Sequence, residues 1–369
     1  GEGSYMQNFK KKKILTIDGG GIRGLLALGM LEKIESQLRQ ATRNPGMLLS
    51  DYFDYISGTS TGAILATALS TGMSTAEIRP FYLECSQEIF KKASLSKRLY
   101  FKYKSEEITK ILKDTFGETT TLGSDSIKTL LMIVMRNATT GSPWLMSNNP
   151  DALFNQRDLL DCNLDLPLWQ LVRASTAAPS FFEPESIMLG DTEFLFVDGG
   201  ITPYNNPSFQ TFLMATLNPY KIQWETGEDK MLIVSVGTGM VPDAREKLST
   251  KDMQLAYTAT QTPQALMNAT NAEQDILCRS FGKCLCGDEI DMEIGDMLNI
   301  TGPVKDKLFT YMRYNTNLTS QGLEAIGITN IDPKVLWAMD STKYLDELNR
   351  VGEMAASHKV KTQHFSGFY

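Results

Sequence analysis

Ser60 lies in the pentapeptide GTSTG, between a strand-like aromatic run at 52–56 and an apolar run rich in Ala and Leu. Strand, Gly-x-Ser-x-Gly turn and helix are typical of a nucleophile elbow, in which Gly58 and Gly62 relieve crowding at a sharp turn. At the start of the following helix, the backbone N–H of Thr61 would face an oxyanion formed on a substrate bonded to Ser60. Alone, the pentapeptide fits an ordinary Gly-Ser turn equally well. The prediction therefore needs a base and an oxyanion site elsewhere in the chain.

A serine nucleophile needs a base to take its proton. His358 and His364 are the only histidines and stand near the end of the chain, which argues against a Ser-His-Asp triad. Asp198 is the best carboxylate candidate, because it ends a strand-like run and precedes Gly199 and Gly200, which leave room for a substrate. Its surroundings must raise its basicity, since an aspartate has a low intrinsic pKa. An Asp-Gly turn without a catalytic role is the alternative.

A glycine-rich loop supplies the third part of such a site. Gly19, Gly20 and Gly21 follow the apolar run 14–17 and precede a predicted helix over 25–40. A glycine loop between a strand and a helix N-terminus exposes backbone N–H groups, which suits an anion. We therefore predict that these three N–H groups hold the oxyanion of a tetrahedral intermediate.

Two features of this loop leave alternatives open. Arg23 either braces the loop, meets an anionic headgroup or forms a structural ion pair. Gly19, Gly21 and Gly24 also satisfy G-x-G-x-x-G, the fingerprint of dinucleotide binding. That fingerprint expects a second strand ending in an acidic residue about twenty positions later. The region 37–43 is polar and not strand-like, so the dinucleotide reading is disfavoured.

The elements that must position these groups alternate between strand-like and helix-like stretches. Asp18, Ser60, Asp198 and Gly237 each come directly after a predicted strand. The alternation predicts an α/β fold with a largely parallel central sheet flanked by helices, and the carboxyl ends of parallel strands meet at one edge. The predicted strands are 14–17, 52–56, 126–136, 193–197 and 231–236, and the predicted helices are 25–40, 75–92, 105–116 and 167–176.

The C-terminal third differs in composition. Beyond residue 241 polar and helix-forming residues dominate and the strand signal fades. We expect a mainly helical C-terminal portion, with an amphipathic helix at 344–355 and no recognisable catalytic pattern. At the other end, residues 1–5, ahead of Met6, are interpreted as an expression scar.

Bulk properties bound the partners and the compartment. The chain has 369 residues and a net charge of −7, which gives no support for DNA or RNA binding. No apolar run approaches the roughly 18 residues of a membrane span, and no secretory signal is visible. Five cysteines suggest reduced thiols and a cytosolic setting. Cys278, Cys284 and Cys286 match no zinc pattern and are read as core or loop residues. We predict no metal site.

The segment 95–104 interleaves basic and aromatic residues. Cations suit anionic headgroups and rings suit the acyl boundary, so the segment is a candidate for contact with a membrane surface. A solvated basic segment partly packed on the core is the favoured alternative.

Three motifs in order, DGGGIRG, GTSTG and DGG, together resemble the patatin-like phospholipases, which are lipid acyl hydrolases with a Ser-Asp dyad. AAPSFFEP at 177–184 and SVGTG at 235–239 support the resemblance, which covers roughly residues 12–239. It implies a patatin-like fold and cleavage of fatty acyl esters of membrane glycerophospholipids. In this family's pattern, Ser60 is the nucleophile, Asp198 is the dyad base, and the glycine loop is the oxyanion site, with no cofactor for catalysis.

The resemblance also implies an organisation. Residues 9–315 correspond to the patatin-like phospholipase domain, and residues 316–369 to a helical C-terminal extension for which a regulatory role is one option. The length and the segment YMRYN at 311–315 are similar to the bacterial branch, which includes CapV-like effectors of cyclic-oligonucleotide anti-phage (CBASS) systems. That placement implies activation by a cyclic dinucleotide, bound by basic and aromatic side chains outside the catalytic edge.

The implied partners are therefore membrane phospholipids, reached from the cytoplasm by peripheral contact with the inner membrane, together with the cyclic dinucleotide and, as an option, further copies of the chain. A constitutive patatin-like lipase or esterase without nucleotide control is one alternative. A non-catalytic lipid or nucleotide sensor is the other.

Overall fold

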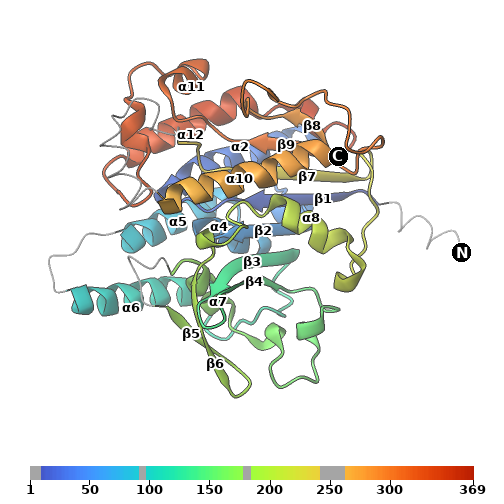
Figure 1. Cartoon of the computed structure of the whole chain (residues 1–369). Helices are drawn as coiled ribbons and strands as arrows, with labels where there is room; N and C mark the ends of the chain where they lie inside the picture. The colour runs from blue at the N-terminus through green and yellow to red at the C-terminus, as the bar shows by residue number, and fades with distance from the viewer. Residues whose placement is uncertain (1–9, 91–96, 178–183, 242–261) are drawn as a thin grey trace, which may run out of the picture.

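One mixed β-sheet forms the centre of the molecule (Figure 1). The computed structural model describes residues 10–90, 97–177, 184–241 and 262–369. Within these residues the strands lie in the order β5-β6-β3-β2-β1-β7-β9-β8, and β4 pairs with β3. The strands are β1 (Lys12–Ile17), β2 (Tyr55–Thr59), β3 (Leu130–Asn137), β4 (Ser142–Ser147), β5 (Glu185–Leu189), β6 (Thr192–Asp198), β7 (Met231–Val236), β8 (Lys283–Cys286) and β9 (Thr310–Tyr314).

The sheet is mostly parallel. β1 runs parallel to both β2 and β7, and the pairs β2–β3, β7–β9 and β8–β9 are also parallel. The antiparallel pairs gather at one side, where β4 and β6 both pair with β3 and β5 pairs with β6. The predicted α/β fold with a largely parallel central sheet flanked by helices is therefore confirmed.

Helices cover both faces of the sheet, because successive residues of the inner strands alternate between two hydrophobic cores. Leu15 and Ile17 of β1 pack with α2, α4, α5, α7 and α12, whereas Ile14 packs with α8 on the opposite face. In Figure 1, α8 and α10 cross in front of the sheet. The helices are α2 (Gly24–Thr42), α3 (Leu49–Tyr52), α4 (Thr61–Ser70), α5 (Thr75–Phe90), α6 (Lys97–Phe116), α7 (Leu168–Ser175), α8 (Ser208–Thr216), α10 (Thr262–Phe281), α11 (Ser320–Ala325) and α12 (Leu345–Lys359).

The C-terminal third contributes strands to the sheet, which corrects the expectation that strand structure fades after residue 241. All residues of β9 are buried, and β9 lies between β7 and β8. β9 escapes sequence analysis because its five residues include Arg313, and a charged residue is unexpected in a buried strand. The expected helix at 344–355 is present as α12.

The residues after 315 pack into the same hydrophobic core as the rest of the chain. Leu336, Val351 and Phe365 belong to the cluster that contains α2 and α4. α12 crosses α2 closely, since a Cβ added at Gly29 would lie 2.7 Å from the carbonyl carbon of Gly352. Other expectations differ in extent. β2 begins at Tyr55 rather than at 52, because Tyr52 ends the short helix α3. β3 begins at Leu130 rather than at 126, and α6 is longer than the predicted helix at 105–116.

Some expectations fall outside the described residues. These are the expression scar at 1–5, most of AAPSFFEP, and the start of the basic and aromatic segment 95–104, whose remainder lies in α6. No helix in the described part of the chain is both long enough and apolar enough to cross a bilayer.

Candidate active site

The turn between β2 and α4 is sharp and strained, as a nucleophile elbow requires. Ser60 has φ 57° and ψ −124°, a conformation that L-residues rarely adopt. A Cβ at Gly58 would overlap the carbonyl of Gly62, and one at Gly62 would lie 2.5 Å from the carbonyl oxygen of Ile17. Glycine is therefore needed at both positions, because backbone from α4 and β1 fills the space that a side chain would occupy.

Ser60 and Asp198 are in direct contact at the carboxyl edge of the sheet. The Ser60 hydroxyl donates a hydrogen bond of 2.6 Å to Oδ2 of Asp198, and the N–H of Gly200 donates one of 2.6 Å to Oδ1. Ser60 keeps 8% of its surface exposed. Burial raises the pKa of Asp198 to about 6, against the opposing effect of these two hydrogen bonds. A carboxylate with this pKa is a better proton acceptor than an exposed aspartate, yet it is ionised at neutral pH.

The glycine loop lies beside the nucleophile, but its first N–H is already used. The N–H of Gly19 donates to the carbonyl oxygen of Asn205 at 3.1 Å, so the expectation that it holds an oxyanion does not fit this geometry. The carbonyl oxygen of Gly19 accepts from Nδ2 of Asn205 at 3.1 Å and from the Thr238 hydroxyl at 2.9 Å. Because N–H and C=O of a trans peptide point in opposite directions, these bonds also fix the direction of the Gly20 N–H.

The next two carbonyls of the loop are anchored as well. The carbonyl oxygen of Gly20 accepts from the N–H of Arg23 at 3.2 Å. That of Gly21 accepts from the hydroxyl groups of Thr61 at 3.0 Å and Tyr82 at 3.1 Å. Within the described residues, the N–H groups of Gly20, Gly21 and Thr61 have no hydrogen-bond acceptor. These three N–H groups are therefore unpaired donors, and the anchored carbonyls of the loop hold them in place.

Arg23 is buried, with 2% of its surface exposed. Its Nε and Nη1 have no hydrogen-bond partner among the described residues, and burial lowers its pKa to about 10. No ion pair of Arg23 is formed within the described part of the chain. Its backbone N–H closes the turn onto Gly20, which agrees with the bracing role.

Arg313 of β9 holds the residue that precedes the glycine loop. Its guanidinium donates to both carboxylate oxygens of Asp18, at 2.9 and 2.6 Å, and to the Ser235 hydroxyl at 2.8 Å. Both charged side chains are buried. Burial opposes the charge on Arg313, but the Asp18 carboxylate outweighs it and raises the pKa of Arg313. Burial also raises the pKa of Asp18, against the opposing effect of Arg313. Both carboxylate oxygens accept from the guanidinium, which is the geometry of an ionised pair, and this contact fixes the end of β1, from which the loop starts.

Sequence reasoning missed several residues that shape this site. Asn205 offered no chemical signal, because an asparagine two residues before a proline is typical of a turn. Thr238 and Arg313 belong to the segments SVGTG and YMRYN, in which the sequence indicates a family resemblance but no role for these two residues. Their roles depend on neighbours in the sheet that sequence spacing does not reveal.

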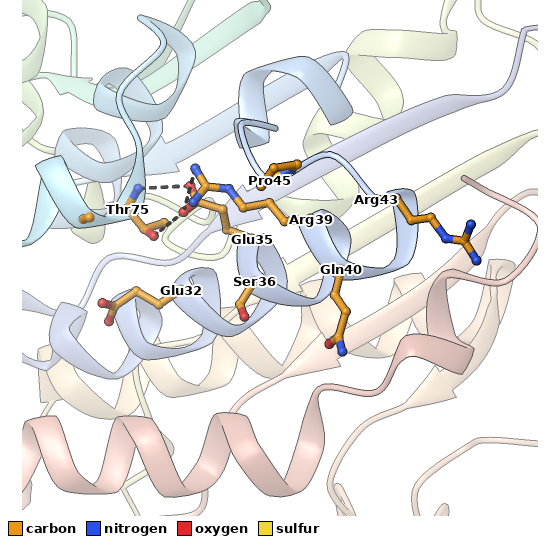
Figure 2. A pocket seen from close by; sticks show the side chains of 9 residues that line it. Glu32, Glu35, Ser36, Arg39, Gln40, Arg43, Pro45 and Thr75 are labelled. Atoms are coloured by element: carbon orange, nitrogen blue, oxygen red, sulfur yellow. Dashed lines mark hydrogen bonds and ion pairs between the residues drawn. The ribbon is translucent and has the colours of Figure 1, made fainter.

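Two surface pockets in the described part of the molecule lie along other elements. Figure 2 shows the one beside α2, where Glu35 accepts hydrogen bonds from Thr75 and pairs with Arg39, while Arg43 points away. The other contains Asp332, Tyr344 and acidic residues of α12. Neither combines several basic groups with aromatic rings, which is the set expected for a cyclic dinucleotide. In the described residues, no group of three or more His, Cys, Asp or Glu side chains is placed to hold a metal.

A family model of patatin-like phospholipases matches residues 15–211, which is more than half of the chain. The chain therefore belongs to the patatin-like phospholipase family. The matched region includes the glycine loop, the elbow and the DGG turn.

Curated relatives extend the match. Patatin-17 of Solanum cardiophyllum is 29% identical over 277 residues, which cover 70% of this chain and 68% of that protein. Probable inactive patatin-like protein 9 of Arabidopsis thaliana is 30% identical over 250 residues, covering 64% of this chain and 62% of that protein. The chain thus spans between 62% and 68% of the length of these relatives.

Solved structures with a related fold are more distant. VipD from Legionella pneumophila is 15% identical with a TM-score of 0.42, covering 95% of this chain and 67% of VipD. ExoU from Pseudomonas aeruginosa, solved with SpcU, is 16% identical with a TM-score of 0.30, covering 72% of this chain and 51% of ExoU.

Proposed function

We propose that the protein is a serine acyl hydrolase of phospholipase A type, which cleaves fatty acyl esters of membrane glycerophospholipids through a Ser60–Asp198 dyad. The observation that carries this proposal is the hydrogen bond of 2.6 Å from the Ser60 hydroxyl to a carboxylate whose pKa burial raises to about 6. Membership of the patatin-like phospholipase family supports the substrate class.

The geometry supports a two-step reaction. Ser60 Oγ attacks the ester carbonyl carbon as its proton passes to Asp198 Oδ2, and the carbonyl oxygen becomes an oxyanion. The N–H groups of Gly20, Gly21 and Thr61 stabilise that oxyanion. When the intermediate collapses, the carbon–oxygen bond to the lysophospholipid breaks and Asp198 returns the proton to the leaving alkoxide. Water then attacks the acyl-enzyme, Asp198 takes a proton from it, and fatty acid leaves as Ser60 is restored.

A non-catalytic lipid or nucleotide sensor is the main alternative, and one relative carries the name of a probable inactive patatin-like protein. The structure of this chain favours turnover. A sensor has no need for a strained serine whose hydroxyl donates to a partly buried carboxylate, because such strain and desolvation cost stability. The dyad and the anchored glycine loop together are what acyl transfer requires.

We further propose that the enzyme works in the cytoplasm and reaches the inner membrane as a peripheral protein when active. Its substrates lie in a bilayer, and no helix of the described residues is fit to cross one. The basic and aromatic segment 95–104 remains the candidate for membrane contact.

Activation by a cyclic dinucleotide in anti-phage defence is the finer proposal, and it rests on the resemblance to CapV-like effectors alone. It predicts low basal activity that rises with the nucleotide. A constitutive lipase predicts the same rate with and without it. The two pockets described above do not combine basic with aromatic side chains in the way expected for a cyclic dinucleotide. A functional assay distinguishes the nucleotide-activated enzyme from the constitutive lipase.

The proposal is tested by fatty-acid release from phosphatidylglycerol and phosphatidylethanolamine vesicles, with and without a panel of cyclic dinucleotides. We expect release by the wild type and a loss of more than about a thousandfold for Ser60→Ala, because no nucleophile remains. Release only with a nucleotide supports the gated effector, and nucleotide-independent release supports the constitutive lipase. Release that survives Ser60→Ala contradicts the proposed mechanism.

A further inference from the structure

The C-terminal end of α7 contacts the backbone of the nucleophile, Ser60. Ser175, the last residue of α7, is fully buried, and its hydroxyl accepts a hydrogen bond of 2.8 Å from the backbone N–H of Ser60. The same hydroxyl donates at 2.6 Å to the carbonyl oxygen of Val134 in β3. One side chain therefore ties the elbow to a helix and to a neighbouring strand.

This contact acts on the strained position of the site. With φ 57°, Ser60 lies outside the conformations that its backbone prefers, and it persists only where surrounding contacts fix it. Its N–H lies at the helix N-terminus, where intrahelical acceptors are lacking. The Ser175 hydroxyl supplies that acceptor inside the protein. It also commits the Ser60 N–H, so that oxyanion donors must come from Thr61 and the glycine loop.

The same end of α7 also holds the base. The backbone N–H of Asp198 donates to the carbonyl oxygen of Ala177 at 3.1 Å, two residues beyond Ser175. Gly199 packs against the carbonyl of Val134, the group that accepts from Ser175. The backbone of the nucleophile is thus anchored on Ser175 and that of the base on Ala177, and these two contacts set their separation.

We propose that Ser175 is a positioning residue for catalysis: its hydroxyl holds the Ser60 backbone in the conformation that aims Oγ at Asp198. The inference rests on the proposed Ser60–Asp198 mechanism. Ser175 touches no substrate in this scheme. It acts through the nucleophile, and its removal lets the elbow relax toward an ordinary backbone conformation.

A matched pair of variants separates positioning from general stability. Ser175→Ala removes the hydroxyl that reaches Ser60. Thr176→Val removes the neighbouring buried hydroxyl at the C-terminal end of α7, which donates to the carbonyl oxygen of Arg173 at 3.0 Å and does not reach Ser60. Ser175→Thr keeps the hydroxyl and serves as the conservative rescue. Each is measured with a soluble p-nitrophenyl ester for kcat and KM, with a fluorophosphonate for the labelling rate of Ser60, and by thermal unfolding.

For Ser175→Ala we expect kcat and the labelling rate to fall together by about 10- to 100-fold with KM within about twofold of wild type, since a small misplacement of a nucleophile carries a cost of this size. The acid limb of the pH–rate profile moves to higher pH, because a weaker bond from Ser60 stabilises the Asp198 carboxylate less. Thr176→Val retains wild-type rates, and Ser175→Thr recovers most of the loss.

Equal rates for Ser175→Ala and wild type overturn the inference, as does an equal loss in Thr176→Val. If Ser175→Ala does not fold, Ser175→Cys carries the test, because its thiol fills a similar space but is a weak hydrogen-bond acceptor. A folded Ser175→Cys protein with a slower rate and a displaced acid limb supports the positioning role, and one with the wild-type rate and profile contradicts it. A different result would show that the proposed function itself is wrong: the Ser60→Ala variant would keep its hydrolase activity.

Discussion

At the scale of single residues, Asp198 is where the proposed catalysis and the stability of the fold oppose each other. Its pKa is raised from 3.8 to about 6 because burial disfavours the charged carboxylate. Between these two pH values the native state binds more protons than the unfolded state. The free energy of unfolding therefore falls as the pH rises through that window, and the cost is complete above it. This loss in the free energy of unfolding accompanies a carboxylate beside Ser60 that is more basic than an exposed aspartate.

We predict a pH dependence from this shift. The rate constant kcat/KM on a soluble ester should fall on the acid side with a midpoint near 6, because protonated Asp198 cannot accept the serine proton.

Asp198→Asn should be inactive yet more stable than wild type by about 1–3 kcal/mol at pH 8, a gain that narrows as the pH falls toward 4. Urea denaturation of both proteins at pH 8 and pH 4 measures this difference in the free energy of unfolding. Equal stability of both proteins at pH 8 would contradict the buried-carboxylate account.

Residue types alone predicted the dyad because serine between glycines and aspartate before glycines are local patterns. The anchoring residues are different. Asn205, Thr238 and Ser175 are polar groups whose partners lie far away in the sequence, so only the folded sheet reveals them. The commitment of the Gly19 N–H to Asn205 belongs to the same class. A glycine motif indicates free N–H groups, but it does not show which of them the fold uses internally.

At the scale of elements, the crossing of α2 and α12 depends on close backbone contact. A Cβ on Gly29 would lie 2.7 Å from the carbonyl carbon and 3.0 Å from Cα of Gly352. These are backbone atoms of another helix, which cannot move aside as a flexible side chain can. The contact brings the C-terminal helix against the one that begins at the glycine loop.

Gly29→Ala distinguishes packing from helix propensity. Propensity alone predicts a gain of about 1 kcal/mol, because alanine favours helix over glycine. We expect instead a loss of about 1–3 kcal/mol in the free energy of unfolding, because the added methyl group forces α12 away from α2. Gly46→Ala is the control, since its Cβ would meet nothing closer than 3.7 Å on an exposed turn. A Gly29→Ala protein more stable than wild type in urea denaturation would refute the close crossing.

The strands beside the motifs followed from their apolar runs, whereas β8 and β9 did not. Hydrophobic pattern is the main signal for a buried strand, and Arg313 interrupts that pattern in β9. Its burial makes sense only with Asp18, which is far away in the sequence and neutralises it across the sheet. The hydrophobic pattern therefore fails to predict a buried strand whose charged residue is neutralised by a partner far away in the sequence.

At the scale of the whole molecule, the C-terminal third is joined to the active site. Arg313 fixes Asp18 at the end of β1, and the carbonyl oxygen of Met339 accepts the N–H of Ile22 at 2.8 Å in the turn that follows the glycine loop. A Cβ at Gly21 would also overlap the backbone of Met339. The division at residue 315 and a regulatory role for the remainder stay predictions, and these contacts place the remainder directly against the glycine loop.

The central claim is that one serine of this chain is activated by Asp198. The most direct measurement is mass-spectrometric mapping of the intact protein after reaction with a fluorophosphonate, in wild type and Asp198→Asn. We expect a single adduct on Ser60 in the wild type and labelling slower by at least about a hundredfold in Asp198→Asn, since the general base is lost. An adduct on another residue, or equal labelling of both proteins, would contradict the account.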